Sequence, residues 1–259
     1  MATTLRTQTS LTALERVLLL IPAAGALVFG LGPLLALGAL ALVAGARGHD
    51  PIIYRLAGAA TLGYAVALLF AIGAGTWRAA HLPVLATLGF NAASIYACGA
   101  SLAGGMTQPV IYLILATSII IVAITIWLLL RHAPVERPTP DSPSWLIWFL
   151  VLATAISIPF ALLPLFVPAT FSSLFGLQGT DVFTFRQGGA AVLGYGVLGI
   201  FELRSRAWSE IFPAALMVLT FDGLVAIVCA LVLLGQLPDA GGSLAPLSLI
   251  AGGCVAVAT

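Results

Sequence analysis

Residues 55–64 read RLAGAATLGY, and residues 186–195 read RQGGAAVLGY. Seven of these ten positions are identical at a spacing of 131 residues, where chance in such a biased composition gives roughly one. The same ungapped shift aligns further residues: Phe29 with Phe160, Pro33 with Pro164, Trp77 with Trp208, Phe90 with Phe221 and Cys98 with Cys229. The pattern predicts a tandem duplication, with repeats at residues 1–131 and 144–259 and a Pro-rich linker at 132–143.

The composition predicts that lipid is the main solvent. The 259 residues are 61% hydrophobic and 7% charged, whereas a soluble domain carries about 25% charged residues. Apolar runs of about 18 residues or more predict transmembrane helices. Eight such runs are present, at residues 15–32, 51–73, 80–101, 107–131, 144–163, 181–203, 208–234 and 243–259. We therefore expect an all-α integral membrane protein of eight transmembrane helices, arranged as two four-helix repeats of the same orientation.

A short interfacial segment is expected after the first and fifth spans. Pro33 should end the first span, because proline interrupts helical hydrogen bonding, which leaves residues 33–49 at the membrane surface or in a re-entrant turn. Pro164 and Pro168 should end the fifth span in the same way. The apolar residues that follow have the spacing of one helix face: Phe171, Leu174 and Phe175.

The distribution of arginine predicts the orientation. Seven arginines fall on one side of the predicted spans and three on the other; the three are Arg47, Arg55 and Arg186. By the positive-inside rule both termini should be cytoplasmic, in a bacterial inner membrane. The net charge of +1 gives no reason to expect a nucleic-acid partner, so the expected partners are membrane lipids and other membrane subunits.

The start of the repeated stretch combines a helix-start signal with a cation. Asp50 and Asp181 have the character of N-caps. Arg55 and Arg186 lie about one turn further on, near the positive end of a helix dipole, where a cation needs a counter-charge. The capping Asp or a lipid phosphate could supply that charge. The arginines are therefore open to two interpretations: structural residues of a helix start, or the basis of a ligand or lipid-headgroup site.

The end of the repeated stretch predicts close helix packing. Small residues four apart allow helix backbones to approach in lipid, and both repeats have such a pair followed directly by tyrosine: Ala59, Gly63 and Tyr64, then Ala190, Gly194 and Tyr195. The two tyrosines are also candidate ligand contacts.

Two polar residues near the middle of predicted spans occupy matching positions. Asn91 in LGFNAAS aligns with Asp222 in LTFDGLV. A carboxylate at mid-membrane is costly and needs a partner, a proton or a water-filled cavity. Asp222 therefore has two interpretations. It either holds helices together through a hydrogen bond to Asn91, a threonine or Tyr195, or it is part of a proton or ligand site. Glu202 lies nearer a helix end, where Arg204 and Arg206 are expected to pair with it.

The sequence offers little for catalysis. It contains no HExxH, GxSxG or phosphate-loop motif and no lysine, and its three histidines lie at span ends or in loops. We lean against an enzyme. No metal, catalytic residue or cofactor is predicted, although a lipid or a lipophilic pigment or quinone could be bound.

The second repeat contains F-x-P-x-x-F-x-x-x-F-G-L, then D-x-F-x-F-R-Q-G-G-A-A-x-L-G-Y. This pattern loosely resembles DoxX-like and related four-helix bacterial membrane proteins of uncharacterised function. The resemblance implies a four-helix bundle, here duplicated, and supplies no site residues. Two functions are expected: an accessory or scaffold subunit or binder of lipophilic cofactor or lipid; or, alternatively, a small-solute or proton-coupled transporter using Asn91 and Asp222.

Overall fold

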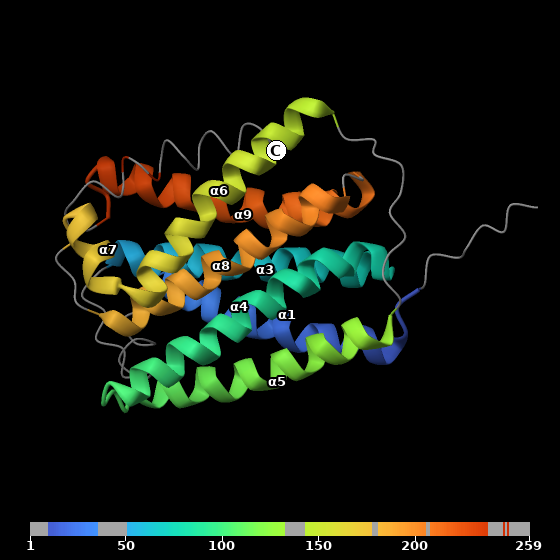
Figure 1. Ribbon diagram of the computed structural model, residues 1–259, viewed down its shortest axis with the longest axis horizontal. Helices are drawn as coiled ribbons and strands as arrows, with labels where there is room; N and C mark the ends of the chain where they lie inside the picture. The colour runs from blue at the N-terminus through green and yellow to red at the C-terminus, as the bar shows by residue number, and fades with distance from the viewer. Residues whose placement is uncertain are drawn as a thin grey trace, which may run out of the picture.

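The computed structural model describes residues 10–35, 51–132, 143–177, 181–205, 208–237, 246 and 248. Within these ranges the fold is a bundle of α-helices (Figure 1). The helices are α1 (Ala13–Leu34), α3 (Pro51–Ala74), α4 (Trp77–Ala103), α5 (Pro109–Arg131), α6 (Ser144–Phe166), α7 (Pro168–Phe175), α8 (Val182–Ser205) and α9 (Trp208–Leu233).

Six helices of the described chain are long and apolar enough to cross a membrane: α1, α3, α4, α5, α6 and α9. These six indicate a multi-pass membrane protein. In their most apolar windows α3 is 61% buried and α4 56%, but α6 only 17%, so α3 and α4 are inner helices and α6 is an outer one. The predicted span at 181–203 is helical as α8, but this helix contains Arg186, Gln187 and Glu202 and is not among the six.

Corresponding helices begin 131 residues apart. Pro51 begins α3 and Val182 begins α8, while α4 and α9 begin at Trp77 and Trp208. Packing within each predicted repeat is joined by extensive packing between the repeats, because α3 lies mainly against α1 and α9, and α4 mainly against α8 and α5. The outer helix α6 packs on α8 and α7 rather than on α9.

The two ends of the bundle differ in composition. The helices α1, α4, α6 and α9 begin at one end, where α3, α5 and α8 finish (Figure 1). All the tryptophans of the chain lie on helix turns at this end, which we call the tryptophan end: Trp77, Trp127, Trp145, Trp148 and Trp208. It also carries Arg16, Arg78, Arg131 and Arg204, whereas Arg55 and Arg186 lie at the opposite end. Among the described arginines, the predicted asymmetry is therefore present.

A buried carboxylate ties helices together at the tryptophan end. Glu15 is 1% exposed and completes a capping box with Thr12. The Glu15 Oε1 atom also lies 3.0 Å from Arg131 Nε and 3.0 Å from His132 Nε2, and the His132 ring stacks on Trp77. The start of α1, the start of α4 and the end of α5 are thereby joined.

The prolines expected to end two helices lie in the last turns of these helices or directly after them. Helix α1 continues through Pro33 to Leu34, and α6 continues through Pro164 to Phe166. Proline removes only its own N–H, and the next residues still donate backwards, as Leu35 does to the Leu31 carbonyl at 3.0 Å. Helix α1 therefore ends one residue after Pro33. Helix α6 ends two residues after Pro164 and two before Pro168, which begins α7.

Helix α7 occupies the position predicted for a short helix after the fifth span. Its Phe171 is buried, but Leu174 is 62% exposed, so the three apolar residues do not share one environment. The equivalent segment after the first span, most of the linker and nearly all of the eighth predicted span lie outside the described residues.

Candidate functional site

The repeated ten-residue stretch forms the centre of the bundle. The Tyr64 hydroxyl donates a hydrogen bond of 2.5 Å to the Ala191 carbonyl on α8. The Tyr195 hydroxyl donates one of 2.7 Å to the Ala60 carbonyl on α3. Ala60 and Ala191 are themselves 131 residues apart. The two hydrogen bonds are therefore equivalent, with one donated by α3 to α8 and the other by α8 to α3. Both hydroxyls are thereby satisfied inside the core.

The glycines of the stretch make this exchange possible. A Cβ on Gly63 would overlap the Tyr195 hydroxyl and lie 2.6 Å from the Met217 carbonyl oxygen. A Cβ on Gly194 would overlap the Tyr64 hydroxyl and lie 2.6 Å from the Ala86 carbonyl oxygen. The predicted small-residue faces are therefore helix contacts, and the tyrosines cover them from the other repeat.

The predicted helix caps are confirmed where they are described. The Asp181 carboxylate accepts hydrogen bonds from the Thr184 backbone N–H at 3.1 Å and from the Thr184 hydroxyl at 2.7 Å, as an N-cap does. Asp50 lies outside the described residues.

The arginines that follow the caps have few partners. Arg186 donates to the Ser101 hydroxyl at 3.2 Å rather than pairing with Asp181. Arg55 is 7% exposed, and its buried Nη1 has no hydrogen-bond partner. These observations leave both interpretations of the arginines open.

Among the cavities bounded by described residues, two are related by the 131-residue shift. The smaller, of about 130 Å³, lies among α1, α3, α4, α5 and α8. The larger, of about 630 Å³, lies among α3, α6, α8 and α9. Many lining residues correspond pairwise: Pro22 with Ala153, Gly25 with Ile156, Ala26 with Ser157, Phe29 with Phe160, Tyr64 with Tyr195, Phe90 with Phe221, and Asn91 with Asp222.

The smaller cavity is lined by polar groups that bond to one another. Asn91 Nδ2 donates to the Thr87 carbonyl at 2.8 Å. The Ser94 hydroxyl donates to Gln187 Oε1 at 2.9 Å, and the Ser118 hydroxyl lies 3.2 Å from that of Ser94. These hydrogen bonds join α4, α5 and α8. The polar side chains around the smaller cavity therefore hold these helices together.

The larger cavity is apolar over most of its length. Its lining on α6 runs from Trp145 at the tryptophan end to Pro164, about 30 Å of helix at 1.5 Å per residue. Aromatic rings line both ends, with Trp145, Phe149 and Trp208 at the tryptophan end and Phe160, Phe171 and Phe185 at the other. A volume of 630 Å³ is that of a site for a drug-sized or single-chain lipophilic molecule.

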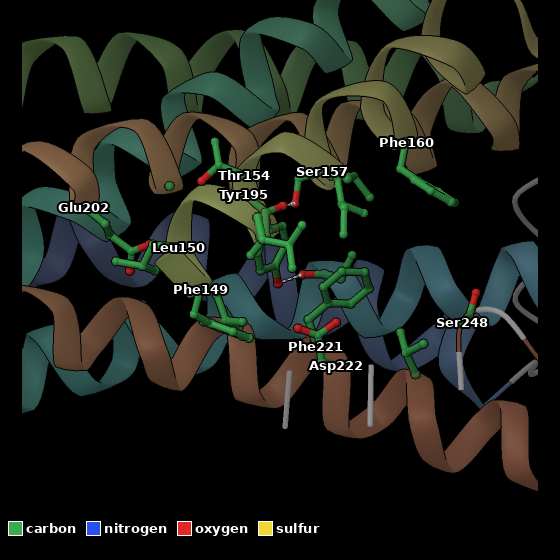
Figure 2. Close-up of a pocket in the computed structure, with 18 of the residues that line it drawn as sticks. Phe149, Leu150, Thr154, Ser157, Phe160, Tyr195, Glu202, Phe221, Asp222 and Ser248 are labelled. Atoms are coloured by element: carbon green, nitrogen blue, oxygen red, sulfur yellow. Dashed lines mark hydrogen bonds between the residues drawn. The ribbon is translucent and has the colours of Figure 1, made fainter. Parts of the chain in front are cut away.

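Two carboxylic acids lie in this apolar lining. Figure 2 shows Asp222 beside Phe221, below Tyr195, and Glu202 beside Leu150 further along the cavity. Glu202 is 3% exposed. In the described part of the chain, no hydrogen bond or ion pair reaches either carboxylate. The cavity therefore offers two acids to whatever occupies it.

The structure separates two groups that the sequence suggested might meet. Asn91 and Asp222 line different cavities, so the hypothesis that they bond to each other is wrong. Tyr195 donates to Ala60 rather than to Asp222. The reason is geometric, because the 131-residue relation places the two residues at equivalent positions on opposite sides of the central tyrosines.

Sequence reasoning missed Glu202 as a site residue. The expected pairing with Arg204 is absent, because Arg204 is exposed and its guanidinium lies 5.6 Å from the Phe201 ring centroid, and the other expected partner, Arg206, lies outside the described residues. On a helix, residues two apart point in different directions, and this signal could have separated the acid from the base.

No group of three His, Cys, Asp or Glu side chains that could hold a metal is present within the described ranges. Comparison with protein-family models, with curated proteins and with solved structures gives no match to this chain.

Proposed function

We propose that this chain is an integral membrane protein that binds a lipophilic molecule in the larger cavity. The observation that carries the proposal is the apolar cavity of about 630 Å³ between α6 and α9. Protein interiors are packed with few voids larger than a water molecule, so a space of this size between two apolar helices favours a ligand. A lipid chain, a pigment or a quinone would match its shape. An accessory or scaffold subunit is less favoured, because that role requires no such cavity.

The architecture that we propose around this site is a tandem repeat of two four-helix units with eight spans. Helix bounds that recur at 131 residues, the reciprocal tyrosine bonds and the paired cavities support it. The residue ranges remain 1–131 and 144–259, joined by 132–143. We place the tryptophan end at the cytoplasmic face of a bacterial inner membrane, because most of the arginines lie there.

Filling the cavity tests the binding function. Ala153 on α6 lines the cavity, whereas Ala155 on the same helix is exposed and does not. Ala153→Trp should therefore abolish saturable binding of diphenylhexatriene, a neutral rod-shaped hydrocarbon, and Ala155→Trp should not. Binding is measured on purified protein in detergent by energy transfer from the tryptophans. Each variant adds one tryptophan, so the donor number is matched. Equal binding by both variants, or none by the unaltered protein, would contradict the proposal.

A second function, proton-coupled or small-solute transport, is favoured by Asp222 alone. This carboxyl lies in the larger cavity, while its counterpart Asn91 cannot release a proton. If the chain is a transporter, Asp222→Asn should fold normally and abolish solute-coupled proton flux in liposomes. If the chain only binds its ligand, diphenylhexatriene binding should survive the same substitution. Retention of a wild-type flux by the Asn variant would exclude this role for Asp222.

A further inference from the structure

The described lining of the larger cavity has acidic groups and no basic one. Among its described lining residues there is no arginine or histidine, while Glu202 and Asp222 contribute carboxyls. Arg204, the nearest base in the sequence, is exposed and lies over Phe201. A buried carboxylate without a partner is costly. The site thus needs a positive group or a proton from elsewhere.

A second unpartnered polar atom lies near Glu202. The Thr154 Oγ1 atom is buried and has no hydrogen-bond partner. A Cβ on Gly199 would overlap this atom, so Thr154 packs directly on α8 at Gly199. Glu202 follows three residues later, about one helical turn. Thr154 thus closes the contact between α6 and α8 beside this region, and the Glu202 carboxylate is the charged group that lines the cavity there (Figure 2).

The rest of that region suits a cation. Phe149 and Trp145 line the cavity at this end, and aromatic faces attract cations electrostatically. Beyond it the lining is apolar as far as Phe160 and Phe171. A charged head near Glu202 would lie toward the membrane interface, and an alkyl tail would extend between α6 and α9.

We propose that the larger cavity selects single-chain amphiphiles with a protonated amine head, held by the Glu202 carboxylate. This inference rests on the proposed function and adds the chemical class of the ligand. The ammonium donates hydrogen bonds to the Glu202 carboxylate, and its charge balances the buried acid. An alkyl alcohol fills the same cavity without the charge, and an alkyl carboxylate brings a second negative charge against Glu202.

The test uses three probes of equal chain length. Octylamine, octanol and octanoate are compared at pH 7 as displacers of diphenylhexatriene from the purified full chain. We expect octylamine to displace it at a concentration on the order of tenfold lower than octanol, since a hydrogen bond to a charged group is the stronger kind. Octanoate should be the weakest. Equal potency of amine and alcohol in the unaltered protein would overturn the proposal without any variant.

Two substitutions assign the head site. Glu202→Gln keeps the shape and removes the charge, so it should abolish the preference for amine and retain octanol displacement. Asp181→Asn is the matched control, because Asn also caps helices and position 181 does not line the cavity; it should keep the preference. A preference retained in Glu202→Gln, or lost equally in Asp181→Asn, would overturn the assignment.

The two proposals fail in different ways. If diphenylhexatriene does not bind the unaltered chain, the proposed function fails. If it binds and is displaced equally well by all three probes, the cavity binds lipophilic molecules and only the amine selectivity is wrong. Asp222→Asn is measured beside Glu202→Gln, because a preference lost there and kept in the glutamine variant would assign the head to Asp222 and overturn the role of Glu202.

Discussion

The Gly63 and Gly194 positions hold the two halves of the bundle at their closest approach. Each glycine lies under a tyrosine hydroxyl and a backbone carbonyl of other helices, and neither carbonyl can move without disturbing its own helix. A side chain at either position must displace both neighbours.

Gly63→Leu and Gly194→Leu should therefore each lower the melting temperature in detergent. Overpacking of this kind costs typically about 1–3 kcal/mol, and we expect values toward the upper end because backbone atoms are involved. Gly99→Leu is the control, because a Cβ there meets nothing within 4 Å. Thermal melts of the purified proteins provide the measurement, and unchanged melts for both glycine variants would show that the interface yields easily.

Local sequence signals predicted local chemistry well and tertiary pairing poorly. Asp181 caps α8 as expected, because a cap depends on residues three positions away. The expected bonds of Asp222 to Asn91 or Tyr195 and of Glu202 to Arg204 are absent, because the direction in which each side chain points is set by helices far along the chain. The Glu202 site needed the position of α6 against α8, which no spacing in the sequence encodes.

At the scale of the helix, hydrophobic runs predicted position better than they predicted helix ends. The bounds of α3, α5, α6, α8 and α9 lie within a few residues of the predicted spans. Helix α1 began earlier than predicted, since Thr12 and Glu15 form a capping box outside the apolar run. Pro33 and Pro164 were expected to end α1 and α6, but each helix continues one or two residues beyond its proline. A proline in the last turn removes only one backbone donor, so the helix can finish that turn.

Inner and outer helices differ in the size and polarity of the side chains on their surfaces. Helices α1, α5 and α6 expose large apolar side chains such as Leu14, Ile119 and Trp148, whereas the inner helices are rich in alanine and glycine that allow close packing. Hydropathy alone ranks the outer helices highest. This is why α8, which is largely covered by its neighbours, carries polar residues and is not among the six apolar helices.

At the scale of the whole molecule, the asymmetry between the ends predicts the orientation. The tryptophan end carries four described arginines and the opposite end two. Ser209→Cys at the tryptophan end should then react with a membrane-impermeant thiol reagent only from the cytoplasm, and Thr107→Cys at the other end only from outside. Both positions are exposed, whereas Cys98 and Cys229 are buried. Reaction of the two variants from the reverse sides would invert the topology.

The pairing of α3 with α9 and of α4 with α8 could not be predicted from the sequence. The predicted duplication gave each repeat four spans and specified no helix pairing between the repeats. Small residues occur on several faces of α3 and α8, so the sequence allowed many close contacts. The structure shows that the two halves are joined at the centre by hydrogen bonds from Tyr64 to Ala191 and from Tyr195 to Ala60.

The reciprocal tyrosine bonds have a consequence for how the chain is made. Ribosomes add about 5–20 residues per second, so the 131 residues between Tyr64 and Tyr195 take on the order of ten seconds to synthesise. During that delay α3 exists in the bilayer while the Ala191 carbonyl that accepts from Tyr64 has not yet been translated. The contacts within the first half, such as α1 on α3, can form in that time, but the face of α3 that packs on α8 and α9 has no native partner until those helices are made.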